Sequence, residues 1–382
     1  MIFLKILFIG ARLFDDVDFY LKEEGIESIL TESNPDAPNL DLANVHFIVP
    51  RGMDMPIKIA KDEHVNGIIP LIGIDDPLMD VAIAKEEVEK EEKIPFIASN
   101  TYTVSISSDK IKTKEFFLKY GINTPKFNII SSISSLKREA FNYPVVLKQR
   151  SGQGGKDIVI ASKFNEIKDY IFNFGESLCE EFIKGSEISI EVLGYNNEYF
   201  PLVPVYKGET TLEGIHPLNK VRSAPVDIEG LDNEKVRSFA CKIAKSLRAE
   251  GIIDIDFIFS KNDKKLYALE INTRPSGTRY LTAASSGIHP LTKLIDMVSG
   301  KFDVISLEKE IKDYFALEIP IGNYDGPLDE KPIKMFTKNS WVVHGPSNHE
   351  RITISGESKE KTMELAKSLL KNRFDDFNLD SL

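Results

Sequence analysis

The stretch Gly251–Gly277 constrains the fold of this chain more than any other. Two apolar, strand-like runs, Ile252–Ser260 and Leu266–Asn272, flank a polar Asn262-Asp263 turn. Apolar runs separated by such a short polar turn are typical of an antiparallel β-hairpin. We therefore expect this stretch to form two paired antiparallel strands of a sheet.

The predicted hairpin brings together oxygen-bearing side chains. A turn centred near Asp263 places Asp256 opposite Glu270, and strand alternation puts Asn272 on the same face. Ionisable residues in apolar strands are rare unless they are paired or bind a cation. Such oxygen ligands suit Mg²⁺, which keeps waters and shares substrate phosphates, and Arg274 follows in position for a phosphate. An edge hairpin with solvated carboxylates is the alternative.

Length and composition narrow the class of protein. A chain of 382 residues has room for about two to four domains, and 42% hydrophobic with 28% charged residues is typical of soluble globular proteins. The net charge of 48 − 59 = −11 argues against sequence-independent nucleic-acid binding. Two cysteines make no disulfide framework, and no apolar run is long enough to span a membrane. We expect a cytoplasmic protein without nucleic-acid or membrane partners.

The first hundred residues alternate between strand and helix patterns. Ile2–Ile9 and Gly67–Leu71 read as buried strands, and Phe14–Glu24 and Asp76–Glu92 as helices, with a further strand at Pro95–Ala98. This rhythm predicts an open parallel sheet. The corner after the first strand lacks the G-x-G-x-x-G dinucleotide fingerprint.

A glycine-rich loop follows a strand that carries Lys148. Gly152, Gly154 and Gly155 lie between two predicted strands, so backbone amides there can surround phosphate oxygens. A mobile hairpin tip is the alternative. Upstream, Lys110 and Lys114 share one face of a helix that begins at Ser108 or Asp109, and we expect that face to be solvated.

An extended acidic run, Leu178–Ile183, leads through a glycine turn to Glu187. Extended backbone can hydrogen-bond an adenine edge, and a carboxylate can accept from ribose hydroxyls, although surface ion pairs explain the glutamates equally well. Farther on, Lys220 and Arg222 are candidates to hold a carboxylate or phosphate, with a solvated basic strand end as the alternative. Ala316–Pro320, Lys331–Phe336 and Arg351–Ser355 predict a small C-terminal sheet.

Taken in order, these motifs resemble the ATP-grasp superfamily of carboxylate–amine ligases, over roughly Ile6 to Leu294. The resemblance is strongest with the carbamoyl-phosphate-synthase-like branch, and within it with the pyrrolysine-pathway ligase that joins methylornithine to lysine. The chain departs from that ligase at Asn272, where an aspartate is expected, and in its richer glycine loop. These departures leave the ATP chemistry intact and the substrates unassigned.

The resemblance implies a role for each motif. Lys110 and Lys148 would contact ATP phosphates, with Lys148 also near the adenine, and the glycine loop would close over the triphosphate. Glu180 would face the adenine amino group, the backbone of Glu181, Phe182 and Ile183 would pair with the ring, and Glu187 would hold the ribose. Asp256, Glu270 and Asn272 would bind one or two Mg²⁺ ions, with Mn²⁺ as a substitute. Arg274 would steady the transferring phosphoryl group, and with Arg222, proposed above from the residues themselves, the predicted catalytic residues are Arg274, Lys148 and Arg222.

The predicted fold is α/β and α+β: an N-terminal Rossmann-like domain (1–105), a small ATP-grasp subdomain (106–183), a large one (184–300) and a C-terminal α+β subdomain (301–382). The predicted activity is an ATP-dependent ligase that phosphorylates a carboxylate, expected to be that of an amino acid, for attack by an amine. A phosphotransferase on the same scaffold and a non-catalytic nucleotide-binding module are the alternatives. The expected partners are small-molecule carboxylate and amine substrates and a second copy in a homodimer.

Overall fold

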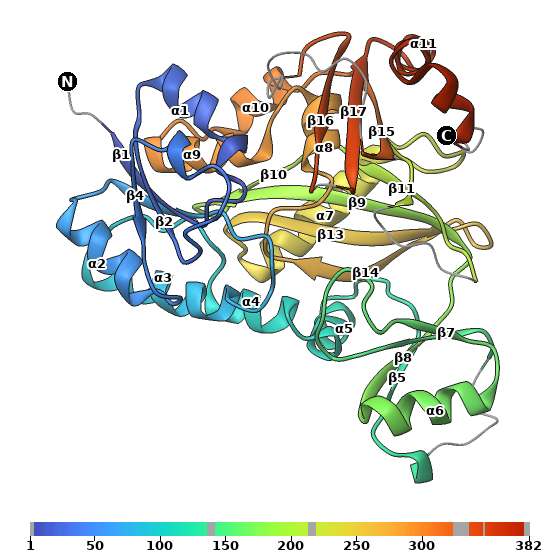
Figure 1. Cartoon of the computed structure of the whole chain (residues 1–382). Coiled ribbons are helices and arrows are strands. Elements are labelled where there is room, and N and C mark those ends of the chain that lie inside the picture. Colours follow the sequence, from blue (N-terminus) through green and yellow to red (C-terminus); the bar gives the residue numbers. More distant parts are fainter. Residues whose placement is uncertain (1–3, 136–141, 213–218, 324–335, 347, 378–382) are drawn as a thin grey trace.

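The computed structural model describes residues 4–135, 142–212, 219–323, 336–346 and 348–377. Its N-terminal part is a four-stranded parallel sheet in the order β3-β2-β1-β4, as the alternating pattern predicts (Figure 1). The strands are β1 (Lys5–Ile9), β2 (Glu27–Glu32), β3 (Val45–Ile48) and β4 (Gly67–Pro70), and the helices are α1 (Asp18–Glu24), α2 (Asp54–Asp62) and α3 (Leu78–Glu91).

Two local predictions in this part are wrong. The segment Pro95–Ala98 forms no strand and contributes one bridge, between Phe96 and Ile68. The helix expected over Phe14–Glu24 starts as a short 3-10 turn, and α1 begins only at Asp18. Tertiary contacts explain the break, because Phe14 packs edge-on against Phe8 and the fully buried Asp16 accepts a hydrogen bond from Arg279.

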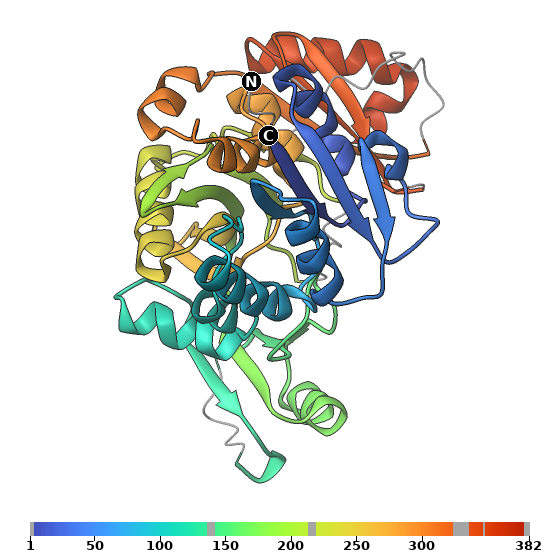
Figure 2. The same cartoon turned by 90° about the vertical axis from the view of Figure 1, so that its left-hand side faces the viewer.

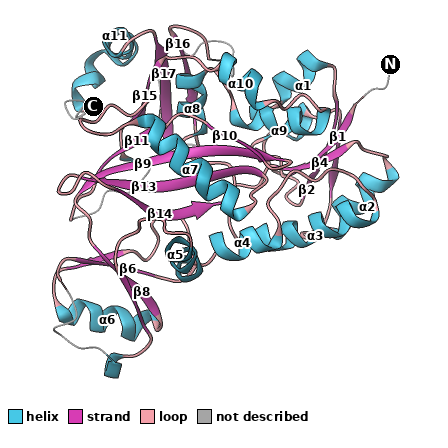
Figure 3. Ribbon diagram, turned by 180° about the vertical axis from the view of Figure 1, so that it is seen from behind, coloured by secondary structure: helices cyan, strands magenta, loops and turns pink. Residues whose placement is uncertain are grey.

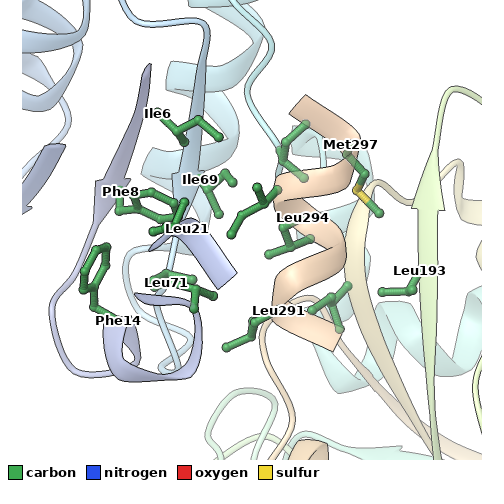
Figure 4. Packing of buried hydrophobic residues seen from close by; sticks show 14 of the residues in the cluster. Ile6, Phe8, Phe14, Leu21, Ile69, Leu71, Leu193, Leu291, Leu294 and Met297 are labelled. Carbon is green, nitrogen blue, oxygen red and sulfur yellow. The ribbon is translucent and has the colours of Figure 1, made fainter. Parts of the chain in front are cut away.

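The N-terminal sheet is fixed to the rest of the molecule by an apolar core. Helix α9 (Pro290–Ser299) presents Leu291, Leu294 and Met297 between two sheets, with Phe8 on one side and Leu193 on the other (Figure 4). Burying each large apolar side chain stabilises the fold by about 1.5–3 kcal/mol. This packing holds the two parts in one arrangement.

A second four-stranded sheet, antiparallel and in the order β5-β8-β6-β7, projects from the body of the molecule (Figures 1 and 2). Helix α5 (Lys110–Lys119) precedes it, and Asp109 caps this helix by accepting from the amides of Ile111 and Lys112. The other elements are α4 (Thr101–Ser107), β5 (Phe127–Ile130), β6 (Val145–Lys148), β7 (Val159–Ala161), α6 (Phe164–Phe174) and β8 (Ser177–Glu181).

The largest sheet has nine strands, in the order β14-β13-β9-β11-β12-β15-β17-β16, with β10 beside β9. One face is covered by the amphipathic helix α7 (Asn233–Leu247), which crosses the sheet in Figure 3. The strands are β9 (Gly185–Tyr195), β10 (Glu198–Pro201), β11 (Val205–Glu209), β12 (Arg222–Ala224), β13 (Gly251–Ser260), β14 (Leu266–Asn272), β15 (Phe315–Gly322), β16 (Ser340–His344) and β17 (Glu350–Gly356).

The predicted separate C-terminal sheet is wrong. The strands β15, β17 and β16 continue the large sheet, because β15 pairs with β12. Most of the expected strand Lys331–Phe336 lies outside the described residues. The remaining helices are α8 (Arg279–Ser286), α10 (Val304–Glu310) and α11 (Lys359–Leu370). Among helices of the described ranges, none is both long and apolar enough to cross a membrane.

Candidate functional site

The hairpin adopts the predicted register. Asp256 lies opposite Glu270, and Asp254 lies opposite Asn272, so all four side chains share one face of the sheet. The opposite face of β13 carries Ile253, Ile255 and Phe257, which pack in the core under α7. Local alternation therefore separates an apolar face from a polar face, and the polar face is the floor of the candidate site.

Lysines surround this floor. Lys207, on β11 beyond the intervening β9, lies 2.6 Å from Asp256 through its Nζ. Burial raises the pKa of Asp256, and the Glu270 carboxylate adds to that increase. Burial acts the same way on Glu270, but Lys110, Lys148 and Lys207 outweigh it and lower the pKa of that carboxyl. The site thus keeps Glu270 ionised within a ring of cations.

The donor set fits a hard divalent cation that brings its own phosphate ligands. In the described part of the chain, no three acidic, histidine or cysteine side chains gather into a complete metal cage. Mg²⁺ is bound in such cases by one or two carboxylates together with waters and substrate phosphates. Asp256, Glu270 and Asn272 fit that pattern, and the ion would neutralise charge on the transferring phosphoryl group.

A buried ion triad lies beside the floor. The Glu180 carboxylate, at 2% exposure, meets Lys114 Nζ at 2.9 Å with one oxygen and Lys148 Nζ at 2.7 Å with the other. Burial alone would raise the pKa of Glu180, but the two lysines lower it to about 2. Burial also lowers the pKa of Lys114 to about 8, against the pull of Glu180.

The structure corrects one expectation here, since Lys114 is fully buried and does not lie on a solvated helix face. Its Nζ also donates to the Thr124 hydroxyl at 2.7 Å, and that hydroxyl donates to the Ala268 carbonyl. The side chain of Glu180 is therefore already held by two ammonium groups in this state.

The glycine loop lies exposed between β6 and β7. Gly152, Gly154 and Gly155 have φ values of 117°, 68° and 77°, in the left-handed region that favours glycine. Lys110 Nζ donates to the Gly152 carbonyl at 2.6 Å, and the Gln153 side chain accepts from the Asp75 amide at 2.9 Å. The loop thus contacts both Lys110 and the N-terminal part of the chain.

The predicted nucleotide-edge residues follow β8. Glu181 is exposed at the strand end and its amide donates to the Lys126 carbonyl, while Phe182 and Ile183 continue the chain into β9. The Glu187 carboxylate lies 2.6 Å from Lys220 Nζ. This strip runs along one side of the triad.

The two predicted arginines differ in their surroundings. Arg274 Nε lies 2.5 Å from Asp75, and its Nη2 donates to the Asn272 side chain at 3.4 Å, so it spans the floor and the N-terminal part. Arg222 is 5% exposed and its Nη1 lies 3.1 Å from Glu318. Arg351 shares Glu318 at 2.6 Å, which ties Arg222 to the C-terminal strands.

Several polar residues of this region were not predicted from the sequence. Asp254 precedes Asp256 by two positions, so alternation alone could have placed it on the same face. Glu191 lies opposite Asp254 on β9, and Lys207 comes from a stretch that has no strand-like pattern. Their signal is tertiary, because it depends on strand order.

Comparisons with known proteins agree with this geometry. Residues 107–278 match the ATP-grasp domain family. The chain is 55% identical over 358 residues to a carbamoyl-phosphate synthase of Methanobrevibacter smithii, covering 94% of this chain and 98% of that one. It is also 24% identical to the carbamoyl phosphate synthase large chain of Methanothermobacter thermautotrophicus. That match covers 80% of this chain and 31% of the large chain.

Solved structures share the fold. The biotin carboxylase domain of Hydrogenobacter thermophilus 2-oxoglutarate carboxylase, solved with MgADP and bicarbonate, has a TM-score of 0.74 at 19% identity, covering 97% of this chain and 90% of that one. An L-amino acid ligase from Bacillus licheniformis has a TM-score of 0.71 at 17% identity, covering 98% and 97%. The chain belongs to the ATP-grasp family of ATP-dependent carboxylate–amine ligases, in its carbamoyl-phosphate-synthase-like branch. The finer resemblance to the pyrrolysine-pathway ligase stays a prediction.

Proposed function

We propose that this protein activates a carboxylate, that of an amino acid, as an acyl phosphate and joins it to an amine, releasing ADP and phosphate. The observation that carries the proposal is the floor itself, where Asp256 and Glu270 face each other among Lys110, Lys148 and Lys207. This arrangement of paired carboxylates and cations suits a magnesium-bound triphosphate.

The chemistry needs two displacements. A carboxylate oxygen forms a bond to the γ-phosphorus as the bond to ADP breaks, which gives the acyl phosphate. The amine nitrogen then bonds to the acyl carbon, inorganic phosphate leaves with the bonding electron pair, and the nitrogen loses a proton. Alignment and charge neutralisation suffice for both steps, so no enzymic nucleophile is required.

Individual residues take the roles that their surroundings support. Lys110 and Lys148 hold phosphate oxygens, and the glycine loop closes over them. Arg274 steadies the transferring phosphoryl group from its position beside Asn272. Arg222, which is paired with Glu318, is the candidate to hold a substrate carboxylate or phosphate.

The adenosine end lies along the strip after β8 in this proposal. Backbone groups of Glu181, Phe182 and Ile183 pair with the adenine ring, and Glu187 accepts from the ribose hydroxyls. Glu180 acts on the adenine amino group only through an oxygen that it shares with a lysine, because each of its oxygens meets one.

A second function is favoured by the relative at 55% identity, which is named a carbamoyl-phosphate synthase. In that case the chain would end its reaction with a phosphoryl transfer and release a phosphorylated product in place of a free amide. We further propose a cytoplasmic homodimer that uses Mg²⁺ or Mn²⁺, in which the two cysteines, Cys179 and Cys241, stay free thiols.

An ADP-release screen tests the proposal. Purified protein receives ATP and Mg²⁺ with single and paired substrates: lysine, ornithine and their analogues, bicarbonate and ammonium chloride. We expect ADP release that requires both a carboxylate and an amine, with an amide in the product. ADP release with a phosphorylated product in place of an amide would favour the second function, and no ADP release with any substrate or pair would contradict both.

A further inference from the structure

A second group of oxygens lies beside the proposed metal ligands. Glu191 on β9, Asp254 on β13 and Thr282 on α8 are 0%, 5% and 0% exposed, and we call them the buried oxygen cluster. Within the described ranges, no hydrogen-bond partner meets either Glu191 carboxylate oxygen, Asp254 Oδ1 or the Thr282 hydroxyl. Three elements therefore bury unmatched oxygens in one place.

The surroundings explain why the cluster stays unmatched. The Thr282 hydroxyl and the Ser276 amide favour the ionised form of Glu191, and the Ser276 hydroxyl favours that of Asp254, but neither Glu191 oxygen nor Asp254 Oδ1 receives a hydrogen bond of good geometry. The nearby Arg279 guanidinium is engaged by Asp16 at 2.6 Å. Lys207, the cation that acts on Asp254, is engaged by Asp256. The cations around the cluster already have partners.

Such an arrangement is costly unless something binds. Buried polar groups are almost always hydrogen-bonded, and an unpaired buried carboxylate costs several kcal/mol as an ion. Burial accordingly raises the pKa of Glu191 to about 7. A compact cation with several N–H donors would satisfy four oxygens at once, which no neutral ligand does as well.

The buried oxygen cluster also lies close to the proposed metal ligands. Asp254 is paired across the hairpin with Asn272, itself a proposed metal ligand, and Asp256 is paired with Glu270 in the next row, so the cluster borders the proposed metal ligands directly. Two residues along a strand span about 7 Å. A group bound at the cluster therefore lies one row from the site of phosphoryl transfer.

We propose that the buried oxygen cluster is the binding site for the nitrogen substrate and takes its protonated amino group, a compact ammonium, which passes one proton to the Glu191 carboxylate before the free amine attacks the acyl carbon. The inference rests on the proposed ligase function and names the class of its second substrate. Negative charge selects a cationic amine, and full burial of Glu191 excludes bulky or branched head groups.

Steady-state kinetics on the full chain test this site. The wild type, Glu191→Gln and the control Glu209→Gln receive ATP, Mg²⁺ and a carboxylate (L-ornithine, D-ornithine or bicarbonate), with ammonium chloride varied at constant ionic strength in sodium chloride. Glu209 lies on the same sheet and is paired with Lys261. We expect Glu191→Gln to raise the KM for ammonium about tenfold or more, and the control to leave it within about twofold.

Hydroxylamine separates the cluster from the ligase chemistry. It is uncharged at neutral pH and traps acyl phosphates as hydroxamates, so Glu191→Gln should lose a much smaller share of hydroxamate formation than of ammonium-dependent activity. Thr282→Val, which keeps both carboxylates, should raise the KM for ammonium about threefold to tenfold and guards against misfolding of the first variant.

The outcomes distinguish two failures. Hydroxamate formation in both proteins with an unchanged KM for ammonium would overturn the cluster assignment and leave the ligase function standing. No hydroxamate and no ADP release in the wild type would overturn the ligase function and this inference with it. A defect in Glu191→Gln that follows added potassium chloride, and not ammonium, would make the cluster a potassium site and overturn the amine assignment.

Discussion

Glu180 and Glu191 are two buried glutamates that differ in their partners. Each oxygen of Glu180 meets a lysine, and its pKa falls to about 2. No partner meets Glu191 within the described chain, and burial raises its pKa to about 7. Nearly equal burial thus leads to opposite shifts, because the neighbouring cations decide the charge state. The first glutamate is held in ion pairs by two lysines, although its Oε1 lacks a hydrogen bond of good geometry, and the second would be completed by the ammonium group that we propose as its ligand.

The largest expected effect is at Glu270, on the floor of the site. Glu270→Gln removes the carboxylate that faces Asp256 and should lower ATP turnover about a hundredfold or more, since charge on the transferred phosphoryl group is then poorly neutralised. ADP release at saturating ATP measures this. Asp263→Asn, in the exposed turn of the same hairpin, is the control, and equal turnover in both variants would remove the metal assignment.

Breaking the buried ion triad around Glu180 is expected to lower the stability of the protein. Lys114→Met leaves Glu180 with one partner and should cost about 3–5 kcal/mol of unfolding free energy, as breaking buried ion pairs does. Urea unfolding monitored by circular dichroism checks it, with the exposed Lys112→Met on the same helix as the matched control. Adding Glu180→Gln should recover part of the loss, and no recovery would mean that Lys114 stabilises by packing alone.

The raised pKa of Glu191 predicts that the stability of the protein depends on pH. The folded pKa of Glu191 is about 7 against an ordinary value of 4.5, so the folded state binds its proton more tightly and stability falls as pH rises through this window. Glu191→Gln should therefore raise the unfolding free energy at pH 8 by about 1–3 kcal/mol and have little effect at pH 4. A lower melting temperature at pH 8 would show that Glu191 is paired.

The smallest effect is expected at the half-buried ion pair of the nucleotide strip. Glu187→Gln weakens its contact with Lys220 and should change stability by less than about 1 kcal/mol. The loss of a ribose partner should raise the KM for ATP about threefold to tenfold with kcat unchanged. An unchanged KM would detach Glu187 from nucleotide binding.

The sequence predicts the hairpin, its register and the parallel N-terminal sheet, because these depend on local alternation and on one short turn. It misplaces Lys114, whose burial depends on the Ala268 carbonyl and on Glu180, both far away in the chain. Glu191 and Lys207 are missed for the same reason, since strand order brings them to the hairpin. Asp254 was also missed, but its position two residues before Asp256 would have been sufficient to place it on the same face.

The strand order also has a consequence for biosynthesis. Strand β12, which carries Arg222, is paired on one side with β11 and on the other with β15, whose residues are made almost a hundred positions later. Glu318 and Arg351 complete its surroundings from still later segments. On the ribosome, the floor of the site can fold early, but the surroundings of Arg222 have to wait for the last strands.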